Sequence, residues 1–187
     1  MLLGLVIPSA GTATINGRPY REVRNSVGAS LEAAGFHPGR TGRGHLRARA
    51  LARGADGSRA DELLASVDLA DSAGRRIGTY SLGMRQRLGL AGAMIGDPDV
   101  LILDEPGNGL DPEGVKWLRG FLRGLAAEGR TVFVSSHLLG EVVQTADHVV
   151  IINCGRLVTA GPIADLTSTG TTLEDLFLSL TSKEGAR

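Results

Sequence analysis

Two adjacent carboxylates, Asp104 and Glu105, directly follow a run of four apolar residues at 100–103. An apolar run without alternation is typical of a strand buried on both faces of a parallel sheet. Ligands of such sheets bind at the carboxyl ends of the strands. Asp104 offers the oxygen ligands that Mg²⁺ prefers, and Glu105 could orient or deprotonate an attacking water. A lone Asp could simply cap the next element, and two adjacent acids are harder to explain by capping. Taken alone, the pair is about as compatible with a structural role as with a functional one.

A second candidate group begins at Ser81, in the segment Tyr-Ser-Leu-Gly-Met-Arg-Gln-Arg at 80–87. Ser81 is a favoured N-cap for a helix predicted over 81–95. Free N–H groups at a helix N-terminus attract phosphate, and Gly83 would let a nucleotide approach the backbone closely. Taken alone, the pattern favours an ordinary capped helix.

Two more polar residues are placed near the acid pair by their position in the chain. His137 follows the apolar run 132–134, so it is expected at the same carboxyl edge, where it could donate to a terminal phosphate. Asp111 and Pro112 predict the start of a helix, with Asp as its cap and Pro in its first turn. This capping role is compatible with a functional one.

The elements that would position these residues alternate along the second half of the chain. Apolar runs at 100–103, 132–134 and 149–152 predict buried strands, and the stretch 112–129 predicts an amphipathic helix between the first two. Strand–helix–strand order favours an α/β core with right-handed crossovers. The opening of the chain predicts the end of a helix that Pro8 and Gly11 break. The remaining predictions are a hairpin at Asn16-Gly17, a strand at 27–31, two or three helices in 43–79, a strand at 155–158 and a helix at 172–180.

Composition narrows the class of protein. The chain has 187 residues, 42% of them hydrophobic and 21% charged, which is ordinary for a globular domain and excludes general disorder. Aromatic residues make up 4%, which argues against a nucleic-acid stacking platform. Cys154 is the one cysteine, so an intrachain disulfide is excluded. No apolar run approaches the roughly 20 residues that span a bilayer.

The formal charge is zero overall but differs between the two halves. Residues 1–95 hold 13 arginines and 7 acidic residues, whereas residues 96–187 hold 7 basic and 13 acidic residues. A basic half could face a polyphosphate or a nucleic acid. Two solvated faces account equally well for the split, and we favour them for a charge asymmetry alone.

Four segments together resemble the ATP-binding cassettes of ABC transporters. In order and spacing, 81–87, 101–106, 109–112 and 136–137 are similar to that family's signature loop, Walker B strand, D-loop and H-loop. The reading Ser-Leu-Gly-Met-Arg-Gln-Arg, together with the ending 172–178, resembles the bacitracin- and daunorubicin-type drug-export ATPases. Those relatives often carry Glu at the Q-loop position, which Glu32 would occupy here.

The resemblance implies a role for each residue in phosphoanhydride hydrolysis. Asp104 would serve Mg²⁺, Glu105 would polarise the hydrolytic water, and His137 would contact the γ-phosphate of ATP. Ser81 and Gly83 would cover the γ-phosphate of ATP held by the opposite subunit.

Two further residues are implied to communicate between sites. Asp111 would link the two nucleotide sites across a cassette dimer, and Glu32 would sense both the nucleotide and a membrane-spanning permease subunit. The implied location is the cytoplasm, at the inner face of the cell membrane. No nucleic acid is expected as a partner.

The fold implied is an α/β, ABC-type P-loop NTPase core, a mostly parallel sheet flanked by helices with a helical signature subdomain. Three parts are expected. Residues 1–40 would be a remnant of the N-terminal β-subdomain, 41–96 the helical subdomain, and 97–187 the RecA-like core.

The phosphate loop of such a cassette, G-x-x-x-x-G-K-[ST], does not occur in the sequence. Its two lysines, Lys116 and Lys183, both follow the signature segment, and neither follows a glycine. We therefore expect an N-terminally truncated cassette that by itself binds ATP weakly or not at all. The strand at 100–103 is expected to lose a neighbour and to present an unpaired apolar edge.

Three other functions remain open at this stage. The chain could be a non-catalytic, degenerate cassette that docks on a membrane subunit or on a partner cassette. It could be a DNA-associated ABC ATPase, against which the low aromatic content and the transporter-like signature count. It could also be no functional protein at all, but the result of a misassigned start or of a decayed gene.

Overall fold

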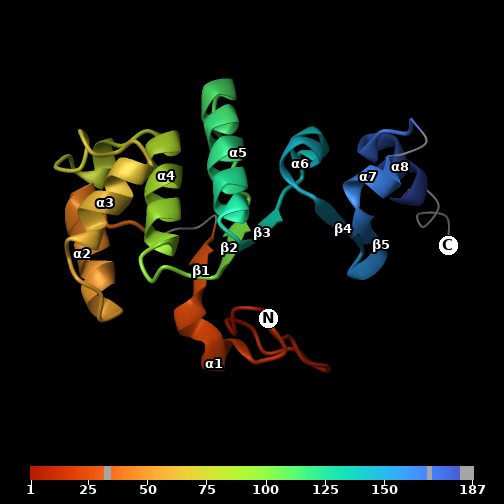
Figure 1. Cartoon of the computed structure of the whole chain (residues 1–187), viewed down its shortest axis with the longest axis horizontal. Helices are drawn as coiled ribbons and strands as arrows, with labels where there is room; N and C mark the ends of the chain where they lie inside the picture. Colours follow the sequence, from red (N-terminus) through yellow and green to blue (C-terminus); the bar gives the residue numbers. More distant parts are fainter. Residues whose placement is uncertain (32–34, 168–169, 182–187) are drawn as a thin grey trace. The chain divides into compact units, whose positions relative to one another are not determined.

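The computed structural model describes residues 1–31, 35–167 and 170–181. They divide into two compact units, Met1–Ser135 and Ser136–Arg187, each of which is described by itself (Figure 1). This division falls inside the predicted core segment 97–187. The three predicted parts stay a prediction.

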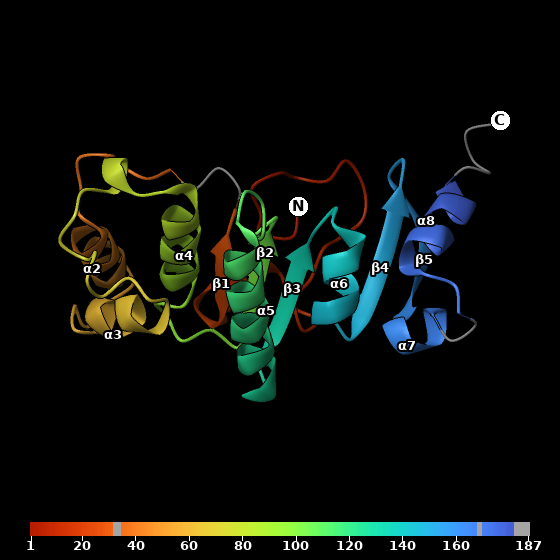
Figure 2. The ribbon, with the colours of Figure 1, turned by 90° about the horizontal axis from the view of Figure 1, so that it is seen from above.

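The first unit is built on a parallel three-stranded sheet (Figure 2). Its strands are β1 (Val27–Ser30), β2 (Val100–Asp104) and β3 (Thr131–Ser135), in the order β1-β2-β3. The register pairs Asp104 with Ser135 at the carboxyl ends of β2 and β3. The predicted parallel sheet is thus confirmed, and the acid pair lies at the carboxyl edge where it was expected.

Side chains of β2 alternate between two hydrophobic clusters because successive residues of a strand face opposite sides. Leu101 and Leu103 belong to the main core, which also holds residues of α4 (Leu82–Ala93) and α5 (Pro112–Ala127). The other two apolar residues of β2 pack in a smaller cluster with residues near the N-terminus, and its buried members are Ile15, Val27, Val100 and Ile102. Burial on both faces explains why β2 reads as an unbroken apolar run.

The expected unpaired edge at 100–103 is wrong, because β2 is hydrogen-bonded on both sides. Among the described residues of the first unit, β1 and β3 are the two edge strands, and each pairs with β2 alone. The return from α5 places β3 at the end of the sheet, beyond β2. The side chain of Phe133 is accordingly 52% exposed, and the run 132–134 is not buried on both faces as predicted.

The predicted helices of 43–79 are present, and they pack with α4. They are α2 (Gly42–Ala52), α3 (Arg59–Ser66) and a 3-10 turn, η2 (Ile77–Thr79). Thr41 caps α2 by accepting a hydrogen bond from the amide of Gly44 at 3.0 Å. This helical part shares the main core with α5.

The N-terminal segment differs from the helix end that was predicted before Pro8 and Gly11. It forms turns instead, followed by α1 (Tyr20–Val23) and the 3-10 turn η1 (Arg24–Ser26). Asn16 and Gly17 do form a tight turn, with φ values of 50° and 76°, between the bridged residues Ile15 and Arg18. A single bridge replaces the predicted hairpin, because the residues on either side of it do not continue a ladder.

The second unit contains an antiparallel pair, β4 (His148–Asn153) and β5 (Arg156–Pro162). Around it lie α6 (Leu139–Thr145), α7 (Ile163–Leu166) and α8 (Leu173–Thr181). The strand predicted at 149–152 therefore forms, but its pairing among the described residues is with β5 and not within the parallel sheet.

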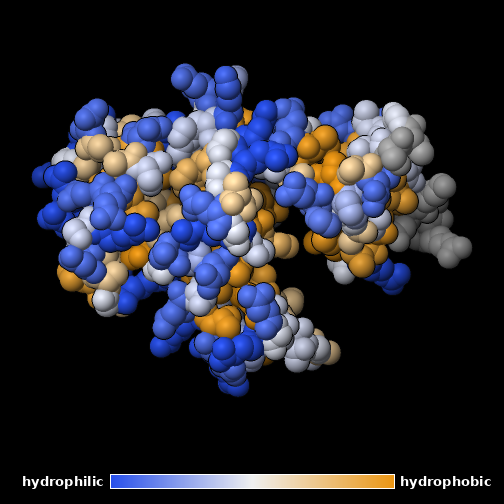
Figure 3. Space-filling view, in the orientation of Figure 1, coloured by the Kyte–Doolittle hydropathy of each residue, from blue (hydrophilic) through white to orange (hydrophobic). Residues whose placement is uncertain are grey.

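The second unit exposes apolar side chains on its strands. Ile151 is buried, whereas Val150, Ile152 and Leu157 are 56%, 66% and 66% exposed. Hydrophobic atoms are correspondingly visible on the surface of this unit (Figure 3). Among the helices that the structure describes, none is both long enough and apolar enough to cross a membrane.

Candidate functional site

The acid pair lies at the carboxyl end of the central strand. Asp104 is the last residue of β2 and is exposed, and Glu105 follows it half-buried. The hydroxyl of Ser135, at the matching end of β3, donates a hydrogen bond of 2.6 Å to Oδ1 of Asp104. Sequence reasoning did not single out Ser135, although its position after the run 132–134 put it at the same edge.

Glu105 has an uncommon backbone conformation, with φ at +47°. Left-handed backbone is sterically unfavourable for a residue with a long side chain. Its amide donates to both oxygens of Ser135, at 3.2 Å to the carbonyl and 3.1 Å to Oγ. The chain thus turns sharply at the end of β2 and is tied to β3 at that point.

The donor set suits Mg²⁺ that is held partly by a substrate. The described residues contain no group of three or more His, Cys, Asp or Glu side chains that could enclose a metal ion. Asp104 offers one exposed carboxylate, with Oδ1 already bonded to Ser135. Mg²⁺ is commonly bound through one or two carboxylates together with waters and substrate phosphates, so the site fits that mode of binding.

The predicted signature helix is confirmed as α4, with Ser81 as its N-cap. The hydroxyl of Ser81 accepts a hydrogen bond from the amide of Met84 at 3.2 Å. Gly83 lies in the first turn of α4. The capping role is therefore present, and the phosphate-covering role of Ser81 and Gly83 stays a prediction.

The N-terminus of α4 contacts the loop that follows the acid pair. Nε2 of Gln86 donates to the carbonyl of Asn108 at 3.4 Å. Gly109 has φ at +71°, and a Cβ there would collide with the side chain of Leu82. A Cβ on Gly83 would lie 3.3 Å from Leu110. The sequence analysis did not predict this contact. Gly109, a glycine inside the loop, was the one signal that could have indicated it.

Asp111 caps α5, as predicted. Its Oδ1 accepts a hydrogen bond from the amide of Gly114 at 2.8 Å, and Pro112 begins the helix. The cap fixes where the loop from Glu105 ends. A link across a dimer stays a prediction for this residue.

Two predicted site residues are not placed beside the acid pair by the structure. His137 belongs to the second unit, so its role toward a terminal phosphate stays a prediction. Glu32 lies outside the described residues.

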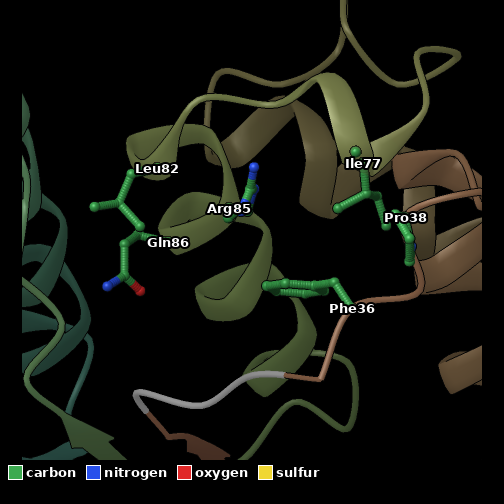
Figure 4. Close-up of a pocket in the computed structure, with 7 residues that line it drawn as sticks. Phe36, Pro38, Ile77, Leu82, Arg85 and Gln86 are labelled. Atoms are coloured by element: carbon green, nitrogen blue, oxygen red, sulfur yellow. The ribbon is translucent and has the colours of Figure 1, made fainter.

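A pocket of about 360 Å³ lies in the first unit on another side of α4 (Figure 4). Phe36 and Pro38 line it from the loop after β1, and Ile77 lines it from η2. On α4, its lining residues are Leu82, Arg85 and Gln86. Leu82 and Gln86 also contact the loop 108–110, so the pocket and the acid site share the first turns of α4.

His45 packs beside this pocket wall, with its ring 5.1 Å from that of Phe36. It is 7% exposed, and neither ring nitrogen has a hydrogen-bond partner. Burial lowers the pKa of His45, and the charges of Arg49 and Arg40 lower it further. The imidazole is therefore held neutral in the folded chain.

Two arginines of α2 are paired at the surface. Arg43 and Arg47 form ion pairs with Asp61 at 2.6 and 3.1 Å. The hydrogen bond from Arg43 is the main cause of the lowered pKa of the Asp61 carboxyl. These pairs agree with the interpretation of the basic half as a solvated face.

A protein-family model described as "ABC transporter" matches residues 1–108. The chain belongs to the ABC transporter family. The match includes the ABC signature segment and the acid pair, and the α/β fold with a parallel sheet flanked by helices is the one expected for an ABC ATP-binding subunit.

Curated relatives support the same assignment. The bacitracin transport ATP-binding protein BcrA of Bacillus licheniformis is 41% identical over 172 residues, covering 89% of this chain and 56% of the relative. The lantibiotic transport ATP-binding protein SrtF of Streptococcus pyogenes is 35% identical over 160 residues, covering 84% and 69%. The resemblance to bacitracin-type ATPases is thus confirmed, and the chain spans about half the length of the BcrA relative that it matches.

A solved structure described as the ATP binding subunit of an ABC transporter is also similar. The TM-score is 0.83 at 26% sequence identity, and the match covers 96% of this chain and 80% of the other.

Proposed function

We propose that this chain is the part of an ABC exporter that carries the hydrolytic carboxylates for ATP. The observation that supports this most directly is the acid pair at the carboxyl end of β2, where Ser135 binds both Asp104 and the backbone of Glu105. The reaction is hydrolysis of a phosphoanhydride, driven by positioning and charge neutralisation.

Each residue has a part in that reaction. Asp104 would hold Mg²⁺, which when bound supplies charge neutralisation at the phosphates. Glu105 orients the attacking water and accepts its proton. His137 donates a hydrogen bond to the terminal phosphate.

The remaining residues complete a site shared between two cassettes. Ser81 and Gly83, at the N-terminus of α4, cover the γ-phosphate of ATP held by a second cassette. Asp111 joins the two sites across that dimer. Glu32 senses nucleotide and permease.

The triphosphate itself requires a backbone cradle and a lysine that these 187 residues do not contain. We propose that a polypeptide segment outside these residues supplies them and pairs with the outer edge of β3, which among the described residues has β2 as its one strand partner. A parallel strand there would end at the same carboxyl edge as Asp104. It would also cover the exposed side chain of Phe133.

The partner would be a membrane-spanning permease, and the cargo a drug or another small molecule. The named relatives are bacitracin and lantibiotic transport proteins. We propose that the permease binds in the pocket beside Phe36 and Arg85. A permease segment bound there would contact the same turns of α4 that contact the loop after Glu105. We propose accordingly that the protein works in the cytoplasm at the inner face of the membrane.

The test is ATP hydrolysis by the protein purified with its membrane partner from the source cell. We expect Mg²⁺-dependent hydrolysis that falls at least about 100-fold in Glu105→Gln, because amide and carboxylate differ in their ability to take a proton. Glu113→Gln, a matched change in the first turn of α5, should leave the rate unchanged. Equal rates in wild type and Glu105→Gln would overturn the assignment.

The second candidate is a non-catalytic cassette that docks on a permease or on an intact cassette. The missing phosphate loop favours it. Calorimetry with Mg²⁺ and ATP on the isolated chain tests whether a phosphate loop must be supplied from outside these residues. We expect weak or no binding of ATP. Micromolar affinity would show that the chain does not need a supplied loop. Co-purification with a permease, but without hydrolysis, would establish the docking module instead.

A further inference from the structure

Ser135 contacts both acids of the site through one side chain. Its hydroxyl donates to Oδ1 of Asp104 and accepts from the amide of Glu105. Its carbonyl oxygen accepts from the same amide. Three of its hydrogen bonds therefore reach the two residues on which the proposed reaction depends.

The hydrogen bond to Asp104 fixes the direction of the carboxylate. At 2.6 Å it has the length of a charge-assisted O–H···O⁻ bond, which is stronger than a neutral one. Because Oδ1 is engaged by Ser135, rotation of the carboxylate is restricted, and Oδ2 is the oxygen that this hydrogen bond does not use. A free carboxylate at an exposed position would sample several orientations.

The hydrogen bonds to Glu105 hold an unfavourable backbone. A left-handed conformation of a non-glycine residue persists where its surroundings determine it, and such residues cluster at functional sites. The amide of Glu105 is shared between the carbonyl and the hydroxyl of Ser135. Removing the hydroxyl would take away one of the two acceptors that Ser135 offers to the amide of Glu105.

We propose that Ser135 is a positioning residue for the acid pair. It aims Asp104 at the metal and holds the backbone of Glu105 in the conformation that directs its carboxylate. The proposal deepens the proposed function and rests on it for its catalytic consequence. Ser135 does not itself touch the reacting atoms in this assignment.

A hydroxyl is required because it donates to Asp104 and accepts from Glu105 at the same time. Alanine does neither, whereas threonine keeps both capacities. The pair Ser135→Ala and Ser135→Thr therefore separates the hydroxyl from the general effect of a substitution. Ser136→Ala is the matched control, since the hydroxyl of Ser136 accepts from the amide of Leu138.

The first experiment does not depend on ATP. Amide hydrogen exchange of Glu105 is followed by NMR in the full chain, for the wild type and the three variants. We expect exchange of this amide to become about tenfold faster in Ser135→Ala and to stay near the wild-type rate in Ser135→Thr and Ser136→Ala. Unchanged protection in Ser135→Ala would overturn the positioning role. A threonine variant that exchanges as fast as alanine would overturn it too.

The second experiment measures ATP hydrolysis by the Ser135 variants in the permease-bound protein. We expect Ser135→Ala to raise the Mg²⁺ concentration for half-maximal hydrolysis and to lower kcat about tenfold, with KM for ATP unchanged and activity restored in Ser135→Thr. A change in the amount of folded protein alone would scale kcat without moving the Mg²⁺ dependence, and that result would contradict the proposal. Absence of hydrolysis in the wild type would refute the proposed function, and amide exchange would still decide the role of Ser135.

Discussion

Glu105 is a residue whose type was readable from the sequence but whose backbone conformation was not. Its place after an apolar run predicted a carboxylate at a strand end. Nothing in that run predicted φ at +47°, which depends on the oxygens that β3 brings to its amide. Since a left-handed residue points its side chain differently from an extended one, the direction of the carboxylate is a property of the pairing between β2 and β3.

His45 carries a prediction at the same scale. The unfolded chain protonates this histidine near pH 6.5, whereas burial first, and then Arg49 and Arg40, keep it neutral in the folded chain. The unfolded state therefore binds more protons below that pH, so stability is fully present above about 6.5 and is lost as the pH falls toward the lowered folded value. The free energy of unfolding should decrease between pH 7 and 5.

Urea denaturation at several pH values measures this slope. His45→Leu and His45→Phe remove the titrating ring, and both should flatten the profile between pH 7 and 5. Carboxyls with a lowered pKa, such as those of Asp61 and Asp97, act in a separate pH range. Their contribution to the stability of the fold is lost only as the pH falls below their ordinary pKa of 3.8. A slope identical in wild type and both variants would show that His45 does not sense pH.

At the scale of elements, α4 contacts both the loop 108–110 and the pocket beside Phe36, two regions that lie apart in the sequence. Its N-cap and apolar spacing were local signals, and both were confirmed. Its contact with the loop 108–110 was not predicted, since the two segments are more than 20 residues apart and share no periodic pattern. The pocket beside Phe36 touches the same turns of the helix.

Gly109→Ala tests this contact. The new Cβ would meet the side chain of Leu82 and would require a left-handed alanine. We expect a loss of about 1–3 kcal/mol in the free energy of unfolding. Denaturant melts measure it, with Gly107→Ala as control, because a Cβ there would lie an ordinary 3.7 Å from Leu118.

The double variant Leu82→Ala and Gly109→Ala separates the two causes. Leu82→Ala removes the collision and leaves the backbone strain, so part of the loss should be recovered relative to the sum of the single changes. Strict additivity of the two changes would contradict a contact between α4 and this loop.

At the scale of the whole molecule, we expect the outer edge of β3 to influence behaviour in solution, because β3 is one of the two edge strands that the described residues of the first unit form. A strand edge with unpaired backbone groups beside an exposed aromatic side chain favours association between chains. Phe133 is 52% exposed on β3, and the N-terminal segment exposes further apolar residues. Without an added strand, we expect the chain to self-associate.

Phe133→Lys places a charge beside that edge and should shift the chain toward monomer, as measured by light scattering after size-exclusion chromatography. Leu51→Lys is the matched control, since Leu51 is 69% exposed on α2, away from the sheet. Equal shifts from both changes would mean that general charge, and not the β3 edge, controls association.

The sequence by itself determined what local patterns can encode. Capping residues located α4 and α5, an unbroken apolar run located β2, and the order of four short motifs identified the family. The tertiary structure decided what depends on pairing between distant segments. In the described residues β2 is central and β1 and β3 are its edge strands, 149–152 pairs with β5, and Ser135 binds Asp104 and Glu105. An apolar run shows that a strand is buried, but its neighbours follow from the path of the whole chain.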